Sequence, residues 1–267
     1  MRSRRRSSLL PGYYRLVLLL LYLPLGVLVL FSISANRTLE FPPEALTLDW
    51  YVKVFENDAL LRSVRNSITV AVGSGVTATI LGTMVAILIV RYDFRGKKLL
   101  IGLSIMPLIV PLIVMGVALL VLFRVAGLNL SLWSIGAGHV VVALPFTLLI
   151  VYSRLGGFDR NLEDAAMDLG ATHIGTLRYV VLPIIAPAMF SALITAFTVS
   201  FDEFAIALFL AGTDPTFPVY LVGQLRFANQ LPVLIALAVL VMLGTLGLLL
   251  VAERILRSGR RTTAIAE

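Results

Sequence analysis

The sequence has no cysteine, only two histidines and few charged residues, which make up 14% of its 267 positions. The absence of cysteine excludes disulfides, thiolate metal sites and a cysteine nucleophile. Two histidines leave little material for a zinc site, so we expect no metal. Soluble domains carry about 25% charged residues, whereas this chain is 59% apolar with a mean hydropathy of +0.96. This composition argues against a water-soluble globule.

Six long uncharged runs occupy most of the chain. Each reaches the ~20 residues that a helix needs to cross a hydrocarbon core of ~30 Å. The runs cover residues 16–36, 66–90, 99–123, 125–153, 179–201 and 227–252. We therefore predict an all-α polytopic membrane protein with six transmembrane helices.

The positive charges are distributed unevenly between the segments that join these runs. Of the 22 Lys and Arg residues, 16 lie in the alternate segments that include both ends of the chain, and 6 lie in the others. The positive-inside rule then predicts that both termini are cytoplasmic. The basic N-terminus could also begin a signal peptide, but the apolar run that follows is longer than a usual h-region, so we expect an uncleaved first helix. The net charge of +7 is thus explained by topology, without nucleic acid as a partner.

Several residues predict how the spans pack or bend. The second run is rich in Gly, Ser and Thr, which allow membrane helices to approach closely. Pro107 and Pro111 predict a kink in the third run, and His139 in the fourth is interpreted as an interhelical hydrogen-bonding residue. Residues 37–65 form the longest external segment, which is interpreted either as a short surface helix that holds Trp50 at headgroup depth or as an ordinary packed loop.

The loop after the fourth run carries the most specific pattern in the chain. Asp159 is expected to cap a helix of about ten residues, and Gly170 to end it. The apolar positions of this helix recur at i, i+3, i+4 and i+7 and are Leu162, Ala165, Ala166 and Leu169. A helix this short is unstable alone, so we predict that it docks on a partner.

This loop resembles the cytoplasmic signature of the permease subunits of binding-protein-dependent ABC importers. The signature reads Glu-Ala-Ala, three residues, Gly, nine residues, Ile, one residue, Leu-Pro. The matching residues here are Asp164, Ala165, Ala166, Gly170, Val180, Leu182 and Pro183. Asp164 in place of Glu and Val180 in place of Ile are conservative departures.

The resemblance implies the fold of a type I ABC importer transmembrane domain, in which this loop is the coupling helix that fits a cleft of the ATPase. The residues expected to couple to the ATPase are Asp164, Ala165, Ala166, Leu169, Gly170, Leu182 and Pro183. The implied partners are a second permease, two ATP-binding cassette subunits, an external solute-binding protein and the lipid of a bacterial inner membrane. The chain lacks Gly-x-x-x-x-Gly-Lys-Ser/Thr, so it has no P-loop. We therefore expect a non-catalytic subunit without a cofactor, with ATP and Mg²⁺ held by the partner subunits.

The resemblance extends over nearly the whole chain and is closest to the C-type permeases of spermidine/putrescine importers. It implies a polyamine as substrate, with another small solute, such as an opine, an amino acid derivative or an aminophosphonate, as the alternative. The expected organisation is a cytoplasmic tail (1–12), a first span with an external segment (13–65), a core permease domain (66–253) with the coupling loop 154–182, and a C-terminal tail (254–267).

Two carboxylates at the outer end of the fifth run are the best candidates for the substrate path. Eighteen helical residues rise about 27 Å, which places Asp202 and Glu203 near the external end of the hydrocarbon core. Carboxylates at that depth face a water-filled cavity or a partner. They are interpreted as an entrance that attracts a cation, for which one acid suffices, or as groups that pair with Arg226, the second permease or the binding protein. Tyr220 and Gln224, after an external turn, are further candidates for contact with a cation.

Two other classes of membrane protein fit the sequence less well. A secondary transporter would need ionisable residues near the bilayer midplane. A membrane-embedded enzyme would need clustered His, Asp or Glu near an interface. The six runs provide neither arrangement.

Overall fold

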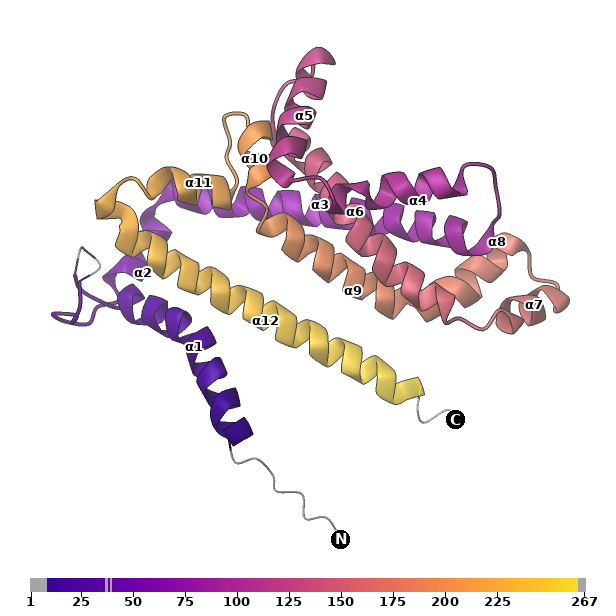
Figure 1. Ribbon diagram of the computed structural model, residues 1–267, viewed down its shortest axis with the longest axis horizontal. Coiled ribbons are helices and arrows are strands. Elements are labelled where there is room, and N and C mark those ends of the chain that lie inside the picture. The colour runs from indigo at the N-terminus through magenta and orange to yellow at the C-terminus, as the bar shows by residue number, and fades with distance from the viewer. Residues whose placement is uncertain (1–8, 37, 39, 264–267) are drawn as a thin grey trace, which may run out of the picture. The chain divides into compact units, whose positions relative to one another are not determined.

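The structure is a computed structural model that describes residues 9–36, 38 and 40–263, and this part of the chain contains helices and no strand. Figure 1 shows these helices as ribbons coloured along the chain. The α-helices are α1 (Leu9–Ser32), α2 (Asp49–Glu56), α3 (Asp58–Arg91), α4 (Lys97–Ile105), α5 (Leu112–Val125), α6 (Leu132–Gly156), α7 (Asn161–Asp168), α8 (His173–Thr176), α9 (Leu182–Phe201), α10 (Ala205–Leu210), α11 (Phe217–Gln224) and α12 (Leu231–Thr263). Short 3₁₀ turns lie at Met106–Leu108 and Ala228–Gln230, and a π-helical turn lies at Leu177–Val181. The predicted all-α class is confirmed.

The predicted spans coincide with helical segments, but fewer than six of these segments are long and apolar enough to cross a membrane. Within the described residues, four helical segments are long and apolar enough to cross a membrane, and one further pair qualifies only as a broken span. The four are Pro11–Ser32, Asp58–Arg91, Leu132–Gly156 and His173–Phe201. The sixth predicted span lies on α12, whose apolar part Leu231–Gly247 is shorter. The count is therefore four, or five with the broken pair.

The predicted kink in the third span is a break. Lys97–Leu108 and Leu112–Val125 are bent by 112° relative to each other. Pro111 precedes α5 with extended backbone angles, φ −56° and ψ 130°. A proline has no N–H for the helix ladder and disfavours helical geometry in the residue before it. Two prolines four residues apart therefore separate the span into α4 and α5.

Contacts within the chain define two compact units. One contains the described residues up to Leu61 together with Leu221–Leu248. In this unit the Trp50 indole N–H donates to the Ser34 carbonyl at 2.6 Å. The short helix α2 is present as predicted. Its Trp50 side chain, however, is buried inside the unit and is not presented to the headgroups. Val52 and Phe55 form the exposed face of α2 instead.

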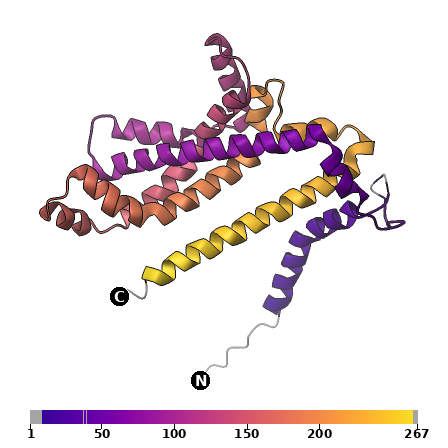
Figure 2. The ribbon, with the colours of Figure 1, turned by 180° about the vertical axis from the view of Figure 1, so that it is seen from behind.

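The other unit contains Arg62–Tyr220 and the last part of α12. In it α3, α6 and α9 lie side by side, as both views show (Figures 1 and 2). The contact between α3 and α6 is so close that a Cβ on Gly82 would lie 2.9 Å from the Leu148 nitrogen. The Thr147 hydroxyl also donates to the Ala78 carbonyl at 2.8 Å. The small residues of the second predicted run thus allow α3 to pack tightly, as expected.

Candidate functional site

The helix predicted in the cytoplasmic loop is present as α7, with eight residues in place of ten. Arg160 holds the N-cap position, and the Asp159 carboxylate accepts a hydrogen bond from the Asn161 N–H at 3.0 Å. Glu163 and Asp164 lie in the first turn, where negative charge favours the positive end of the helix dipole. The prediction that Asp159 caps the helix is therefore wrong by one residue, whereas the predicted acidic first turn is present.

Gly170 ends α7 as predicted. Its φ of +90° is a left-handed conformation, which glycine adopts without the steric cost of a Cβ. The Gly170 N–H donates to the Met167 carbonyl at 2.9 Å, and the Ala171 N–H donates to the Ala166 carbonyl at 3.0 Å. This pair of bonds is a Schellman motif, which turns the chain sharply after the helix.

The apolar stripe of α7 faces away from the rest of the chain. No residue of α7 is buried, and Leu169, just after it, is 91% exposed. The exposed apolar surface continues into α8 and the π-helical turn at Ile174 and Tyr179. Leu182 differs, because it packs against the core formed by α6 and α9, while Pro183 is exposed.

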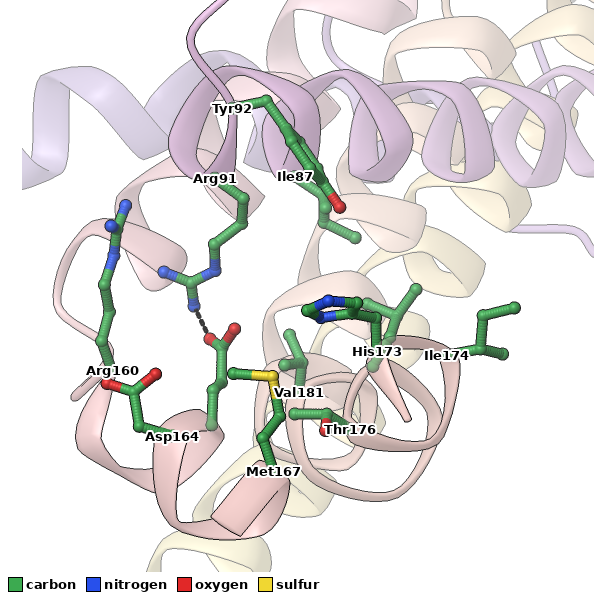
Figure 3. Close-up of a pocket in the computed structure, with 12 residues that line it drawn as sticks. Ile87, Arg91, Tyr92, Arg160, Asp164, Met167, His173, Ile174, Thr176 and Val181 are labelled. Carbon is green, nitrogen blue, oxygen red and sulfur yellow. Dashed lines mark ion pairs between the residues drawn. The ribbon is translucent and has the colours of Figure 1, made fainter. Parts of the chain in front are cut away.

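Polar contacts fasten α7 to the C-terminal end of α3. Arg91 forms an ion pair with Glu163, and the two side chains are only 12% and 18% exposed. The Arg160 guanidinium donates to the Val90 carbonyl at 2.6 Å, and Arg91 lies over the Phe158 ring at 5.2 Å. A cavity of about 410 Å³ lies beside this ion pair, between α3, α7 and α8 (Figure 3).

Arg91 is the first cation of the basic loop after α3, and its ion pair with Glu163 leaves it largely shielded from water. The rest of that loop is exposed, and Lys97 pairs with Asp93 at 2.8 Å. The hydrogen bond and charge of Lys97 hold the pKa of Asp93 below its ordinary value. The partner of Arg91 could not be found from the sequence, because Glu163 is 72 positions away and three other acids lie close to it in the same loop.

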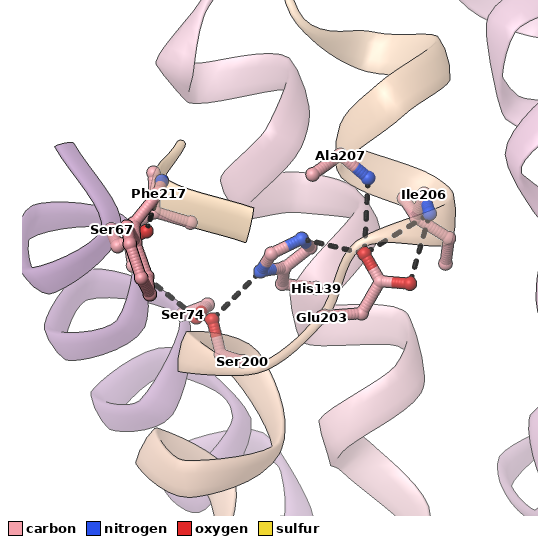
Figure 4. A network of polar contacts seen from close by, with 9 residues as sticks. Ser67, Ser74, His139, Ser200, Glu203, Ile206, Ala207 and Phe217 are labelled. Carbon is pink, nitrogen blue, oxygen red and sulfur yellow. Dashed lines mark hydrogen bonds and ion pairs between the residues drawn. The ribbon is translucent and has the colours of Figure 1, made fainter. Parts of the chain in front are cut away.

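A second polar cluster joins α3, α6 and α9 inside the unit (Figure 4). Ser74 donates to Ser200 at 2.8 Å, and the Ser200 hydroxyl lies 2.7 Å from His139 Nδ1. The other ring nitrogen, Nε2, lies 3.2 Å from a carboxylate oxygen of Glu203. The prediction that His139 bonds between helices is confirmed.

Glu203 is buried, and its carboxylate oxygens are hydrogen-bonded within the chain. Its carboxylate accepts hydrogen bonds from the Ile206 N–H at 2.9 and 3.0 Å and from the Ala207 N–H at 3.0 Å. These are orphan N–H groups of the first turn of α10, which a carboxylate caps favourably. The serine, histidine and glutamate thus lie in the order of a hydrolytic triad. With Ser200 only 3% exposed, the cluster is a packing element with no opening for a substrate.

The structure separates the two acids predicted for the substrate path. Asp202 follows the last residue of α9 and is exposed, whereas Glu203 is buried. Next to Asp202, the Phe201 ring packs against Phe197 at 5.9 Å and Phe217 at 6.4 Å between ring centroids. Asp202 is therefore the exposed carboxylate of this pair.

The remaining predicted site residues lie on α11. Tyr220 and Gln224 are one turn apart, and both are half-buried. The Arg226 guanidinium donates to the Gly223 carbonyl at 2.9 Å and lies over the Phe227 ring. Among the described residues, no group of three His, Asp or Glu side chains is placed to hold a metal ion.

These features match one known family. The model of the binding-protein-dependent transport system inner membrane component matches residues 78–260, and the chain belongs to that family. Among curated relatives, the spermidine/putrescine transport system permease protein PotC of Haemophilus influenzae is 34% identical over 237 residues, which are 89% of this chain and 92% of the relative. The putrescine transport system permease protein PotI of Escherichia coli is 34% identical over 88% of this chain and 87% of its own length.

Solved structures agree on the fold. A chain of a bacterial ABC transporter that imports the acidic polysaccharide alginate superimposes with a TM-score of 0.76 at 14% identity, over 95% of this chain and 96% of that one. A chain of the MetNI methionine ABC transporter gives a TM-score of 0.63 at 20% identity, over 74% of this chain and 95% of that one. The fold is therefore that of an ABC importer membrane subunit, as the signature in the cytoplasmic loop implied.

Proposed function

We propose that this chain is the non-catalytic permease subunit of an ATP-driven importer that moves a polyamine, putrescine or spermidine, into the cytoplasm. The observation that carries the proposal is the match to polyamine permeases across almost their full length, with 34% identity over 92% of one of them. The exposed carboxylate of Asp202 supports a cationic solute, because a negative charge at a water-filled entrance attracts cations and repels anions.

The proposed assembly has four kinds of partner. A second permease completes the translocation path, two ATP-binding cassette subunits hold ATP and Mg²⁺, and an external solute-binding protein delivers the polyamine. In the proposed arrangement both termini and α7 are cytoplasmic, which is the orientation that the positive-inside rule predicts.

The exposed stripe of α7 is the proposed contact with one ATP-binding cassette subunit. It offers apolar groups with an acidic flank at Asp164, which suits a cleft with basic groups at its rim. Ala165 and Ala166 permit a close approach, Leu169 provides the largest exposed apolar group, and Gly170 sets the direction of the chain after the helix. Leu182 and Pro183 begin α9, and Leu182 joins this segment to the core.

The test is uptake of labelled putrescine and spermidine into vesicles that contain this chain with its neighbouring permease, ATPase and binding protein. ATP-dependent uptake of either polyamine is the expected result. If the loaded binding protein stimulates ATP hydrolysis but no polyamine enters, the importer class stands and the substrate is a different small solute. If neither occurs, the proposed class is refuted.

A further inference from the structure

We propose that α3 is the strut that carries movement of α7 to the external turn at residues 211–216, and that Arg91 and Arg160 are the positioning residues that fasten α7 to it. The proposal rests on the proposed function, in which α7 follows the ATPase. It adds which helix transmits the movement and which side chains make the connection at each end.

At the cytoplasmic end, two arginine side chains connect the last turn of α3 to α7, one from each helix segment. Arg91 extends from α3 to Glu163 of α7, and Arg160 extends from the start of α7 back to the Val90 carbonyl. That carbonyl is one of the four that a helix leaves without an internal partner at its C-terminus. The Arg91–Glu163 pair is largely shielded from water (Figure 3), and losing one member of such a pair costs more than losing a surface ion pair.

At the opposite end, α3 holds the external turn. Asn66 Nδ2 donates to the Pro215 carbonyl at 3.1 Å. The Ser67 hydroxyl accepts a hydrogen bond from the Phe217 N–H at 2.8 Å. Both side chains are buried. Twenty-five residues separate Asn66 from Arg91, which corresponds to about 38 Å of helix, so α3 connects the two sides of the membrane.

The part of α3 between these ends is one continuous helix that is packed against its neighbours. It contains no proline, whereas α6 contains Pro145 and α9 contains Pro187, and prolines are a common cause of helix kinks. Close packing holds α3 against its neighbours, since a Cβ on Gly75 would lie 3.3 Å from the Phe197 nitrogen of α9. With the close contact at Gly82, this keeps α3 from bending independently of the bundle.

The covalent connections of α7 are less direct. On one side the chain turns at Gly157 after α6, and on the other side it passes through Gly170 and the π-helical turn Leu177–Val181 before α9. A glycine turn and a π-helical turn can absorb movement. The side-chain contacts to α3 reach a continuous helix without such an interruption, so we expect them to transmit the displacement.

The absence of cysteine makes the test direct, because Thr213→Cys provides a unique labelling position on this chain, in the external turn at an exposed side chain. The complex with its second permease (with no reactive cysteine), ATPases and binding protein is assembled in lipid nanodiscs and labelled with bimane. The change in bimane emission is then measured when the ATPase is trapped with Mg-ATP and vanadate. In the same preparation, the amount of ATPase that co-purifies is determined.

We expect Arg91→Ala to reduce the emission change at least threefold while the ATPase still co-purifies. Exchange of the charges, Arg91→Glu with Glu163→Arg, is expected to restore at least half of the change. The matched control is Lys97→Ala, which removes the exposed ion pair with Asp93 from the adjoining loop and should leave the response intact.

Two results would overturn the proposal. One is a full emission change in Arg91→Ala with the ATPase bound, which would mean that movement reaches the turn by another route. The other is failure of the charge exchange to restore what Arg91→Ala loses, because the ion pair would then not be the connection. A separate result, absence of ATPase co-purification with the otherwise unchanged chain, would refute the proposed function itself.

Discussion

Glu203 offers the sharpest test of how the two neighbouring acids divide their roles. Replacing it with alanine removes the acceptor of the Ile206 and Ala207 N–H groups and the carboxylate that faces His139. Each buried polar group left unpaired costs about 1–3 kcal/mol. With three groups affected, Glu203→Ala should destabilise the chain by at least about 3 kcal/mol.

Glu203→Gln should cost far less, about 1 kcal/mol. If the amide oxygen takes the place of Oε2, it can still accept from the Ile206 and Ala207 N–H groups and from His139 Nε2–H. The N–H₂ group then takes the place of Oε1, which accepts only a second contact from the Ile206 N–H. The glutamine is therefore a nearly isosteric control that removes the charge and keeps the cap.

The assay is unfolding in mixed micelles by titration with SDS, followed by far-ultraviolet circular dichroism, together with polyamine uptake by the assembled complex. We expect the alanine variant to unfold at much lower SDS and the glutamine variant to unfold and transport almost as the unchanged chain does. The reasoning fails if both variants unfold normally and both lose uptake. The charge of Glu203 would then act on the solute directly.

Three further predictions concern other residues. Asp202→Asn should leave stability unchanged and lower polyamine uptake about two- to fivefold at low substrate concentration, since removing an exposed charge costs about 0.5–1 kcal/mol. Uptake by the variant equal to that of the unchanged chain, at both low and physiological salt, would contradict this. Gly170→Val should reduce the ATPase activity stimulated by the loaded binding protein, because β-branched residues strongly disfavour a positive φ, whereas Gly170→Asn should be milder; ATPase stimulation by both variants is the measurement. Gly82→Ala should destabilise the chain by about 2 kcal/mol through overpacking between α3 and α6, whereas Gly73→Ala, where a Cβ would meet nothing within 4 Å, should stabilise the same helix slightly in SDS titration.

Local features were readable from the sequence. Apolar runs of sufficient length predicted the helical segments, because a backbone in hydrocarbon must satisfy its own hydrogen bonds. The end of α7 followed from Gly170, whose effect acts within one turn of the helix, whereas its start lies one residue beyond the position that Asp159 predicted. The break between α4 and α5 was foreseen as a kink from Pro107 and Pro111, but its angle depends on how the two pieces pack. The spacing of the signature in the cytoplasmic loop indicated the family without any knowledge of the fold.

Only the tertiary structure decided which polar groups meet. Asp202 and Glu203 are adjacent in the sequence and equally acidic, and no local rule distinguishes them. Glu203 is buried because the chain turns after α9 and brings the first N–H groups of α10 and the ring of His139 to its carboxylate. Arg91 meets Glu163 for the same kind of reason, since helix packing joins positions 72 residues apart. Hydrogen bonds and ion pairs act over a few ångströms in space, and the sequence fixes such distances only between near neighbours along the chain.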